Sequence, residues 1–506
     1  MLSVGEAGLL QRCRGSGVLF ADTNSLRVHL IGIGGSGMMG AAALLRDMGS
    51  RVSGSDLSLF DGLGVLVQSG VRVSVGHCES QLDADVDLVV ASAAVPETNP
   101  ELSAARARGI PVLKYAELLG ALMAVREGVA IAGTHGKSTT TAMTTYLFRE
   151  AGLSPSFVIG ARSAQLQGSS GLGGGPHFIV ESCEYNRSFL QFRPRMAAVL
   201  NVEPDHLDCY RDLAEIAEAF AEFCGNVGPG GLVVVNGDDP LAVRAASASR
   251  GEIQTFGFGE GADWSARRLQ SDRGRFSFEV WFRGSWLLNA RLSIAGRHNV
   301  SNALAAIALA HRAGGDSTAL SNALETFAGV DRRMTFRGEG HGVTIIDDYA
   351  HHPTEIRVTI EAARMRYQPR RTWIVFQPHQ ASRTRHFMEQ FAESFGLADE
   401  VIVPNVYCAR EYDETAGRSG AEELVARICR RGGRARYLAT FTGVADHLAA
   451  NLAEGDLVMT MGAGDIWKIA DELVERLCQP DDVRRTPRTE HLVSSGGACP
   501  VSVSAA

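Results

Sequence analysis

The chain has 506 residues, 45% hydrophobic and 21% charged, which is ordinary for a globular protein but too long for one hydrophobic core, so we expect about three domains. Its net charge of −8 argues against a nucleic-acid partner, and it has no apolar run near the roughly 20 residues that span a membrane. Its nine cysteines include no C-x-x-C pair, which predicts neither a disulfide framework nor a zinc site and indicates a reducing, cytoplasmic compartment.

Strands alternate with helices along most of the chain, which predicts parallel sheets of the α/β class. We expect an N-terminal extension over residues 1–25 and a first domain over 26–120. A central domain over 121–329 and a C-terminal domain over 330–478 follow. The segment 479–506 is rich in Pro, Ser, Arg and Gly, a composition typical of a disordered tail.

The first domain opens with a nucleotide-type turn. The predicted strand Arg27-Val-His-Leu-Ile31 runs into Gly32-Ile-Gly-Gly-Ser-Gly37, which begins a helix, and a second strand over 51–56 ends at Asp56. Strand, G-x-G-x-x-G turn, helix and a later acid form the dinucleotide-binding fingerprint. This pattern predicts a diphosphate site but does not distinguish NAD from a nucleotide sugar.

A phosphate-binding loop opens the central domain. The run Gly133-Thr-His-Gly-Lys-Ser-Thr139 follows an apolar strand over 129–132 and begins a helix, whose N–H groups can bind anionic oxygens. The ammonium of Lys137 would reach the terminal phosphates, and a hydroxyl of Ser138 or Thr139 would bind Mg²⁺. The loop is shorter than a strict Walker A loop. We predict a nucleoside-triphosphate site here.

Acidic and histidine residues follow the next two strands of this domain, predicted over 177–181 and 196–202. Glu181 and Glu184 follow the first strand, and Asp205-His-Leu-Asp208 follows the second. Ligands of parallel sheets bind beyond the carboxyl ends of the strands, and carboxylates and imidazoles can hold a divalent cation. His206 could instead be a structural histidine, and Glu181 a surface carboxylate.

The rest of the central domain carries weaker signals. We expect a loop over 168–175, an amphipathic helix over 212–224 and antiparallel strands over 263–294. An alanine-rich helix starts at His298-Asn-Val-Ser-Asn302, where Asn299 could either cap the helix or contact a ligand.

Two polar runs follow strands of the C-terminal domain. Its strands are expected at 343–347, 372–377, 400–404 and 456–461. After the first comes Asp347-Asp-Tyr-Ala-His-His-Pro-Thr-Glu355, and after the second comes Gln377-Pro-His-Gln-Ala-Ser-Arg-Thr-Arg385. Buried acids and histidines are costly without partners, so we expect these groups to be used. Arg383 could bind a carboxylate or a phosphate, and the alternative is a solvated basic loop.

Eight sequence blocks between residues 27 and 470 resemble those of the Mur ligases, in the same order. They are Ile31–Gly40, Val52–Asp56, Gly133–Thr141, Glu203–Asp208, His298–Ala306, Asp347–Glu355, Phe376–His379 and Met461–Asp465. One such block could mislead, but eight in register are very specific.

The resemblance implies a three-domain α/β architecture with a Rossmann-like N-terminal domain for a UDP-sugar, a P-loop-type central ATPase domain and a mobile Rossmann-like C-terminal domain for an amino acid. It implies the first ligation of peptidoglycan precursor synthesis, in which ATP and Mg²⁺ serve to join L-alanine to the lactyl carboxylate of UDP-N-acetylmuramate through an acyl phosphate. It leaves open whether the protein is a monomer or a homodimer.

The resemblance also implies roles for individual residues. The UDP-sugar would contact Gly32, Gly34, Gly35, Ser36, Gly37, Met38, Ser55 and Asp56. ATP would contact Gly133, Thr134, His135, Gly136, Lys137, Ser138, Thr139, Asn299, Asn302 and Asp348. Mg²⁺ would be held by Ser138, Glu184 and His206. L-alanine would meet Tyr349, His351, His379 and Arg383, the last pairing with its carboxylate. Catalytic roles are implied for Lys137, Glu184, His206, His351 and Arg383.

Two departures and three alternatives accompany the resemblance. The run Ser182-Cys-Glu-Tyr-Asn186 replaces an acid-rich family run, and only Glu184 clearly matches. The loop after His379 keeps Arg383 but not its usual neighbours. Sister ligases of later steps carry a modified lysine beyond His206, and the helix 212–224 has none, which favours the first-step enzyme. The alternatives are a recycling ligase that attaches a preformed peptide, an NAD-dependent oxidoreductase, and a nucleotide-binding scaffold.

Overall fold

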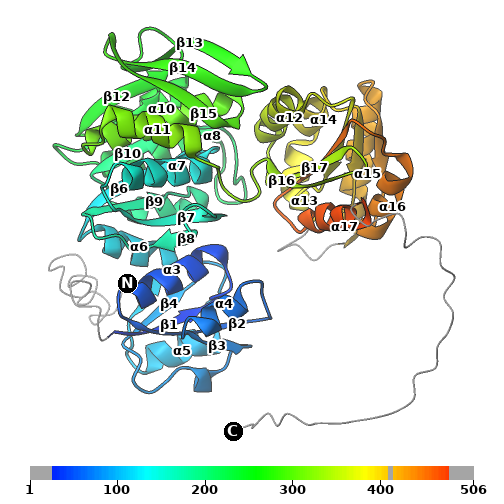
Figure 1. The fold of residues 1–506 in the computed structure, drawn as a ribbon. Coiled ribbons are helices and arrows are strands. Elements are labelled where there is room, and N and C mark those ends of the chain that lie inside the picture. Colours follow the sequence, from blue (N-terminus) through cyan, green and yellow to red (C-terminus); the bar gives the residue numbers. More distant parts are fainter. Residues whose placement is uncertain (1–25, 408–413, 478–506) are drawn as a thin grey trace, which may run out of the picture.

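The computed structural model describes residues 26–407 and 414–477, which form three α/β units, each around its own sheet (Figure 1). The predicted three-domain α/β architecture is confirmed, whereas the domain boundaries near residues 120 and 329 stay a prediction. The expected extension over 1–25 and the tail over 479–506 lie outside the described residues. No helix in the two described ranges has the length and apolar character that a membrane crossing requires.

The N-terminal unit is a five-stranded parallel sheet in the order β3-β2-β1-β4-β5. Its strands are β1 (Arg27–Ile31), β2 (Arg51–Asp56), β3 (Arg72–Val75), β4 (Leu88–Ala91) and β5 (Val112–Lys114). Its helices are α3 (Ser36–Asp47), α4 (Leu63–Gln68), η1 (Glu79–Gln81), α5 (Pro100–Ala107) and α6 (Tyr115–Met123). The first two strands have the predicted bounds. The sequence analysis missed β3, a half-exposed edge strand of alternating Arg, Val, Ser and Val.

The central unit is a ten-stranded sheet in the order β15-β14-β13-β12-β11-β10-β6-β9-β7-β8. Its strands are β6 (Glu127–Ala132), β7 (Ser156–Ser163), β8 (Gly168–Gly171), β9 (His177–Glu181), β10 (Met196–Val199), β11 (Leu232–Asn236), β12 (Glu252–Gly257), β13 (Trp264–Asp272), β14 (Arg275–Phe282) and β15 (Ser285–Ala295). Its helices are α7 (Lys137–Glu150), η2 (Tyr185–Gln191), α8 (Leu213–Gly225), α9 (Pro240–Ala246), α10 (Arg297–Arg312) and α11 (Ser317–Thr326). The predicted antiparallel strands over 263–294 are confirmed as β13, β14 and β15.

The loop predicted over 168–175 is wrong for its first half. Residues Gly168–Gly171 form β8, which pairs antiparallel with β7 at the edge of the central sheet. Its sequence, Gly-Ser-Ser-Gly, has no intrinsic strand preference. The segment forms a strand because it pairs with β7 and because α3 of the N-terminal unit packs against both strands. The small side chains suit this contact, since a Cβ at Gly40 of α3 would already lie 3.4 Å from the hydroxyl of Ser169.

The C-terminal unit is a six-stranded sheet in the order β16-β17-β21-β18-β19-β20. Its strands are β16 (Thr335–Gly340), β17 (Val343–Asp348), β18 (Arg371–Phe376), β19 (Glu400–Val403), β20 (Ala435–Tyr437) and β21 (Asp456–Met461). Its helices are α12 (Pro353–Tyr367), α13 (Ala381–His386), α14 (Met388–Ser394), α15 (Glu414–Arg430), α16 (Phe441–Asn451) and α17 (Trp467–Leu477). The four predicted strands are confirmed to within a residue or so, and the edge strands β16 and β20 were missed.

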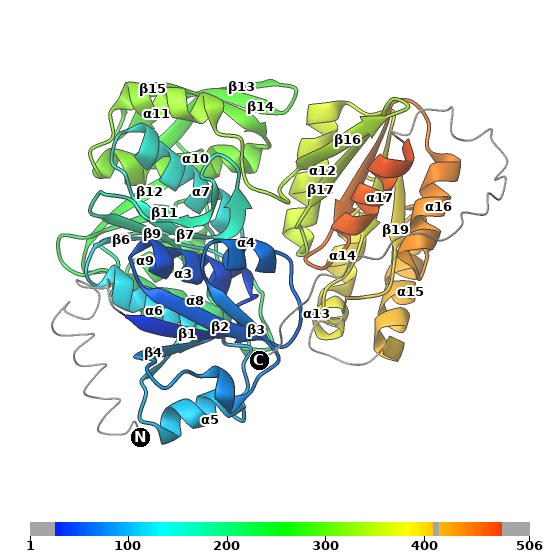
Figure 2. The same cartoon turned by 60° about the horizontal axis from the view of Figure 1, so that its bottom comes forward.

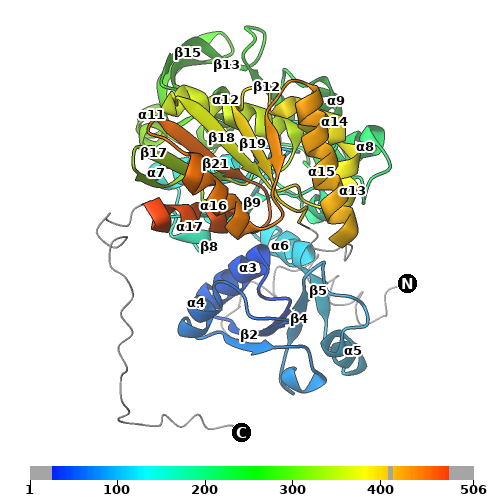
Figure 3. The ribbon, with the colours of Figure 1, turned by 90° about the vertical axis from the view of Figure 1, so that its right-hand side faces the viewer.

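The first two units share one hydrophobic core. Buried residues of β1, α3 and α6 belong to the same cluster as residues of β6, β10 and α8. The backbones also approach closely: a Cβ at Gly120 of α6 would lie 2.5 Å from the carbonyl oxygen of Gln191 in η2. Figures 1 and 3 show α3 and α6 lying directly against the central unit. Separating these two units would expose apolar surface, so we expect them to move as one body.

The C-terminal unit joins the central unit through polar contacts instead. Among the described residues, apolar contacts across this seam are few: Leu207 of the central unit packs on the C-terminal core, and Met365 of α12 packs on the central core. Figure 2 shows α12 facing the central unit. At the start of this helix Thr354 donates to Glu203 at 2.7 Å, and the Nε2 atom of His352 contacts the carbonyl oxygen of Pro204 at 3.1 Å. Charged and polar contacts separate with little loss of apolar burial, which suits a mobile domain.

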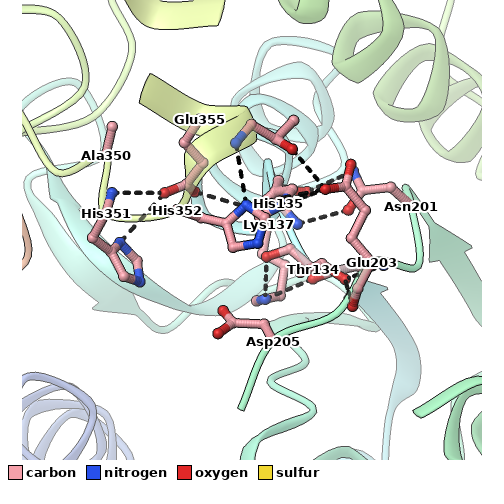
Figure 4. A network of polar contacts seen from close by, with 12 residues as sticks. Thr134, His135, Lys137, Asn201, Glu203, Asp205, Ala350, His351, His352 and Glu355 are labelled. Atoms are coloured by element: carbon pink, nitrogen blue, oxygen red, sulfur yellow. Dashed lines mark hydrogen bonds and ion pairs between the residues drawn. The ribbon is translucent and has the colours of Figure 1, made fainter. Parts of the chain in front are cut away.

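His135 of the phosphate loop lies at the centre of this polar seam. Its ring nitrogens are 3.4 Å from the carboxylate of Glu203 and 3.5 Å from that of Glu355 on α12, and its ring lies against His352 (Figure 4). Burial alone would lower the pKa of His135, but the two carboxylates outweigh it and raise the pKa to about 9. Because the pKa is raised, this cationic bridge is complete below the usual histidine pKa of about 6.5 and is lost as the pH rises through about 9.

We predict that replacing the partner across the seam will return His135 toward ordinary behaviour. In the variant Glu355→Gln the pKa of His135 should fall from about 9 toward the usual value of about 6.5, because one of the two carboxylates that hold the proton is gone. The measurement is an NMR titration of histidine ring resonances. Glu218→Gln, on the exposed face of α8, is the matched control and should change nothing. A wild-type His135 that titrates near its usual pKa would contradict the assignment.

Candidate active site

Three neighbouring parallel strands build the phosphate end of the site. The order β10-β6-β9 places the loops that follow these strands side by side, since their carboxyl ends meet at one edge of the sheet. The loop after β6 is the predicted phosphate loop. Gly133 there has φ +148°, and a Cβ on it would lie 2.8 Å from that of Leu200. Gly136 has φ +81° and faces Asn302. Side chains larger than hydrogen would block both approaches.

Lys137 is held at the start of α7 with its ammonium turned back over the loop. Its Nζ atom donates to the carbonyl oxygens of Gly133 at 2.6 Å and Thr134 at 3.1 Å, and lies 2.9–3.0 Å from both oxygens of Glu184. Burial would lower the pKa of Lys137, but Glu184 more than compensates, so the pKa is raised and the side chain is cationic. Both side chains are almost fully buried. The loop thus holds a positive charge beside a carboxylate.

The hydroxyl of Ser138 points toward the same carboxylate-rich edge. It donates to Glu181 at 2.9 Å, and the second oxygen of Glu181 accepts from the backbone N–H of Gly160 on β7 at 2.6 Å. A Cβ on Gly160 would lie 2.7 Å from the Glu181 carboxylate. Glu181 is therefore an internal partner of the loop, and not the surface carboxylate that the sequence left open.

His206 lies across from Lys137. Its Nε2 atom is 3.7 Å from Glu184 and 3.8 Å from Asp205, and its backbone has φ +53°, an uncommon value for histidine. Burial lowers the pKa of His206, partly offset by Asp205 and Glu184, so the ring is neutral near pH 7 and can offer a lone pair. A serine hydroxyl, a carboxylate and a neutral imidazole form a donor set that fits Mg²⁺ or a similar divalent cation.

Six of the ten residues predicted to bind ATP line one cavity, whereas Gly133, Thr134, Lys137 and Ser138 are not among its lining residues. This cavity of about 520 Å³ lies between the central and C-terminal units, and Asp348 and two asparagines of α10 reach it together with the phosphate loop. The predicted residues that line it are His135, Gly136, Thr139, Asn299, Asn302 and Asp348. Asn299 does not cap its helix, which begins at Arg297; it donates to the carbonyl oxygen of Ala295 at 2.7 Å. Burial raises the pKa of Asp348 to about 6.

The predicted UDP-sugar residues fall into two groups. Gly35, Ser36, Gly37 and Met38 line a second cavity of about 660 Å³ at the start of α3, which Tyr115, Asn186 and Ser188 complete. The remaining four, Gly32, Gly34, Ser55 and Asp56, are not among the residues that line it.

Internal contacts account for most of that second group. The carboxylate of Asp56 accepts from the N–H of Gly34 at 2.8 Å. Ser55 is fully buried and donates to Glu101 at 2.7 Å. A Cβ at Gly34 would lie 2.5 Å from the ring of Phe60. These residues therefore shape the turn that presents the start of α3.

The residues predicted to meet the amino acid come together at the carboxyl ends of β17 and β18. The ring of His351 lies 5.2 Å from that of Tyr349 and 6.3 Å from that of His379. Burial lowers the pKa of His351 to about 3, so its ring is neutral. Arg383 on α13 is also near, but its guanidinium donates to Asp205 of the central unit at 2.6 Å.

Sequence reasoning missed three carboxylates that the structure places in the site. Glu203 and Asp205 belong to a block that the analysis quoted, and Glu355 ends another, yet none received a role. Their partners lie far along the chain: Glu203 and Glu355 both face His135, and Asp205 pairs with Arg383, which is 178 residues away. His135, Glu203 and His352 offer ligand atoms within 4.8 Å of one another. Because the pKa of His135 is raised to about 9, its ring carries a proton near pH 7, and a cation bound by these three residues would have to displace it.

Comparisons with known proteins cover all three units. Family models match residues 27–127 ("Mur ligase family, catalytic domain"), 131–310 ("Mur ligase middle domain") and 332–464 ("Mur ligase, glutamate ligase domain"). A curated UDP-N-acetylmuramate–L-alanine ligase of Agathobacter rectalis is 40% identical over 453 residues, which is 89% of this chain and 98% of the relative.

Solved structures agree. A crystal structure of the UDP-N-acetylmuramate–alanine ligase of Thermotoga maritima has a TM-score of 0.76 and 29% identity, and the match covers 89% of this chain and 99% of that one. A murein peptide ligase of Psychrobacter arcticus has a TM-score of 0.68 and 26% identity, with 89% and 98% covered. A similarity of this extent, running through all three units, shows that the chain belongs to the Mur ligase family.

Proposed function

We propose that the protein joins L-alanine to the lactyl carboxylate of UDP-N-acetylmuramate at the expense of ATP, giving UDP-N-acetylmuramoyl-L-alanine, ADP and phosphate. The observation that carries the proposal is the placement of Lys137, Ser138, Glu184 and His206 at one sheet edge, where Lys137 and His206 both face Glu184 and Ser138 donates to the neighbouring Glu181. The names of the relatives that match the full chain support the same reaction. Family membership sets aside the oxidoreductase interpretation of residues 32–56.

The reaction has two group transfers. An oxygen of the lactyl carboxylate forms a bond to the γ-phosphorus of ATP while the bond to the β,γ-bridging oxygen breaks, which releases ADP and leaves an acyl phosphate. The ammonium of L-alanine releases one proton to solvent, and its nitrogen then bonds to the acyl carbon while the carbon–oxygen bond to phosphate breaks; the nitrogen releases a second proton to solvent as the amide forms. The amide and inorganic phosphate leave.

Lys137 serves the first transfer. Negative charge shifts onto the phosphoryl oxygens as the bridging bond breaks, and a fixed ammonium in a buried loop stabilises that charge. Contacts with two carbonyl oxygens and with Glu184 hold the Lys137 ammonium over the phosphate loop, where the phosphates of ATP would lie. The cavity lined by Asn299, Asn302 and Asp348 would hold the adenosine part of ATP, and the cavity at the start of α3 would hold the UDP-sugar.

Ser138, Glu184 and His206 would hold Mg²⁺. When bound, the cation would neutralise phosphate charge and so let a carboxylate approach the γ-phosphorus. The neutral ring of His206 leaves its lone pair available, and Glu184, now paired with Lys137, can turn its carboxylate between the two positive partners. Tyr349, His351, His379 and Arg383 would line the amino-acid site, where a neutral His351 does not compete with Arg383 for the substrate carboxylate.

We predict that Lys137→Ala abolishes turnover while the fold survives. The rate of ADP release should fall by at least about a thousandfold, because a preorganised charge in the transition state is lost. A coupled ADP assay measures the rate, and a thermal melting curve verifies the fold. Lys468→Ala, at an exposed lysine of α17, is the matched control and should retain activity. Near-normal turnover of the Lys137 variant would rule out the mechanism.

We predict that His206→Ala raises the Mg²⁺ concentration needed for half-maximal rate by about tenfold or more, since changes around metal ligands cost that much in affinity. Titration of the rate with MgCl₂ at saturating ATP measures the effect. An unchanged Mg²⁺ dependence would remove His206 from the metal site.

We predict that phosphate release from ATP in the presence of UDP-N-acetylmuramate depends on free L-alanine, and that short peptides do not replace it. The measurement is a phosphate-release assay across free amino acids and the peptide L-Ala-γ-D-Glu-meso-diaminopimelate. Faster release with the peptide would favour the recycling activity of the murein peptide ligases. Release that requires no added amine would contradict ligation.

A further inference from the structure

An ion pair between two domains closes the amino-acid side of the site. Asp205 comes from the loop after β10 of the central unit, and Arg383 comes from α13 of the C-terminal unit. The guanidinium donates to the Asp205 carboxylate at 2.6 Å. Only 9% of the Arg383 side chain and 7% of the Asp205 side chain are exposed. Charges this deeply buried must be paired, so neither can lose its partner without gaining another.

The pair lies in the wall of a small cavity. The cavity has a volume of about 220 Å³ and is lined by Asp205, His206, Leu207, Gln380, Arg383 and Phe387, among others. It is smaller than the roughly 300–1,000 Å³ of sites for drug-sized ligands, so it suits a molecule of a few heavy atoms. Leu207 and Phe387 add apolar surface beside the two charges. A small cavity with one buried carboxylate, one buried guanidinium and an apolar wall has the chemistry of a site for a free amino acid.

Asp205 is the carboxylate that is placed to serve an ammonium group. Two other buried carboxylates of the site pair with cations that the amino acid would not replace: Glu184 pairs with Lys137, and Glu355 pairs with His135, Arg333 and His351. Asp205 is buried against the guanidinium of Arg383, whose charge a substrate ammonium could replace. It also lies 3.8 Å from His206, next to the proposed metal-binding edge where the acyl phosphate would form.

We propose that Asp205 binds the ammonium group of the amino-acid substrate while Arg383 binds its carboxylate, an inference that rests on the proposed function. In the free enzyme the two side chains satisfy each other. A zwitterion that enters between them replaces each partner with one of the same charge, so no buried charge is left unpaired at any stage. Asp205 would thus fix the nitrogen on the side of the cavity that faces His206 and the reacting carboxyl group.

The test is a comparison of Michaelis constants for all three substrates. In Asp205→Asn the KM for L-alanine should rise by at least about tenfold, the value of one charged hydrogen bond, because the amide keeps the size but loses the charge. The KM values for ATP and UDP-N-acetylmuramate should stay within about twofold of the wild type. Asp205→Glu should restore part of the affinity for L-alanine. Asp272→Asn, at an exposed aspartate at the end of β13, is the matched control.

Two results would overturn the proposal: an unchanged KM for L-alanine in Asp205→Asn, or an equal rise in the KM of all three substrates, which would mean that the pair merely holds the domains together. If the variants do not fold, inhibition of the wild type by L-lactate decides the matter, because lactate has the carboxylate and methyl group of alanine but no ammonium. Inhibition at least about tenfold weaker than the affinity for L-alanine supports the ammonium site, and equal strength overturns it. Failure of the proposed function would look different, because the wild type would then release no phosphate with any amino acid.

Discussion

The contact between Lys137 and Glu184 is the interaction on which the site depends. A buried ammonium and a buried carboxylate, each costly alone, neutralise one another beside the phosphate loop. The sheet order makes this possible, because β6 delivers the lysine and its neighbour β9 delivers the glutamate from adjacent carboxyl ends. In the proposed reaction, these charges would therefore be in place before any substrate arrives.

The two seams between the units differ in kind, and that difference assigns them different tasks. The N-terminal and central units share a core that runs through α3, α6 and α8, so the turn at the start of α3 keeps a fixed position relative to the phosphate loop. The C-terminal unit meets the central unit through His135, Glu203, Glu355, Asp205 and Arg383. A ligase that must admit three substrates and then bring them together needs one rigid joint and one that opens. The apolar residues between the first two units make the rigid joint, and the charged residues at the C-terminal unit make the joint that opens.

Much of the fold could be read from the sequence because it depends on local pattern. Strands such as β1 and β2 carry apolar runs that end at glycine turns or polar groups, and the helix after the phosphate loop follows from the loop itself. The strand β8 could not be found, since its Gly-Ser-Ser-Gly sequence forms a strand only through β7 and α3. In the site, the loop residues and the histidine-rich runs were recognised in the same way.

What the sequence could not provide were partners separated by long stretches of chain. Arg383 was identified as a carboxylate-binding residue, but nothing local pointed to Asp205 as its partner in the free protein. Ser55 and Asp56 were expected to face a ligand, whereas the fold turns them toward Glu101 and Gly34. Side-chain direction at the end of a strand depends on which strands and helices lie beside it, and that is a property of the tertiary structure.

The charged contact between the central and C-terminal units also makes domain opening sensitive to the surrounding solution. Dissolved salt screens charges in solvent over a Debye length of about 10 Å at 0.1 M ionic strength but screens buried pairs much less, so it acts on these charges mainly once the seam has opened. Ionic strength can therefore stabilise the open arrangement of the C-terminal unit without disturbing the apolar contact between the other two units. The polar joint thus responds to ionic strength, and the hydrophobic joint does not.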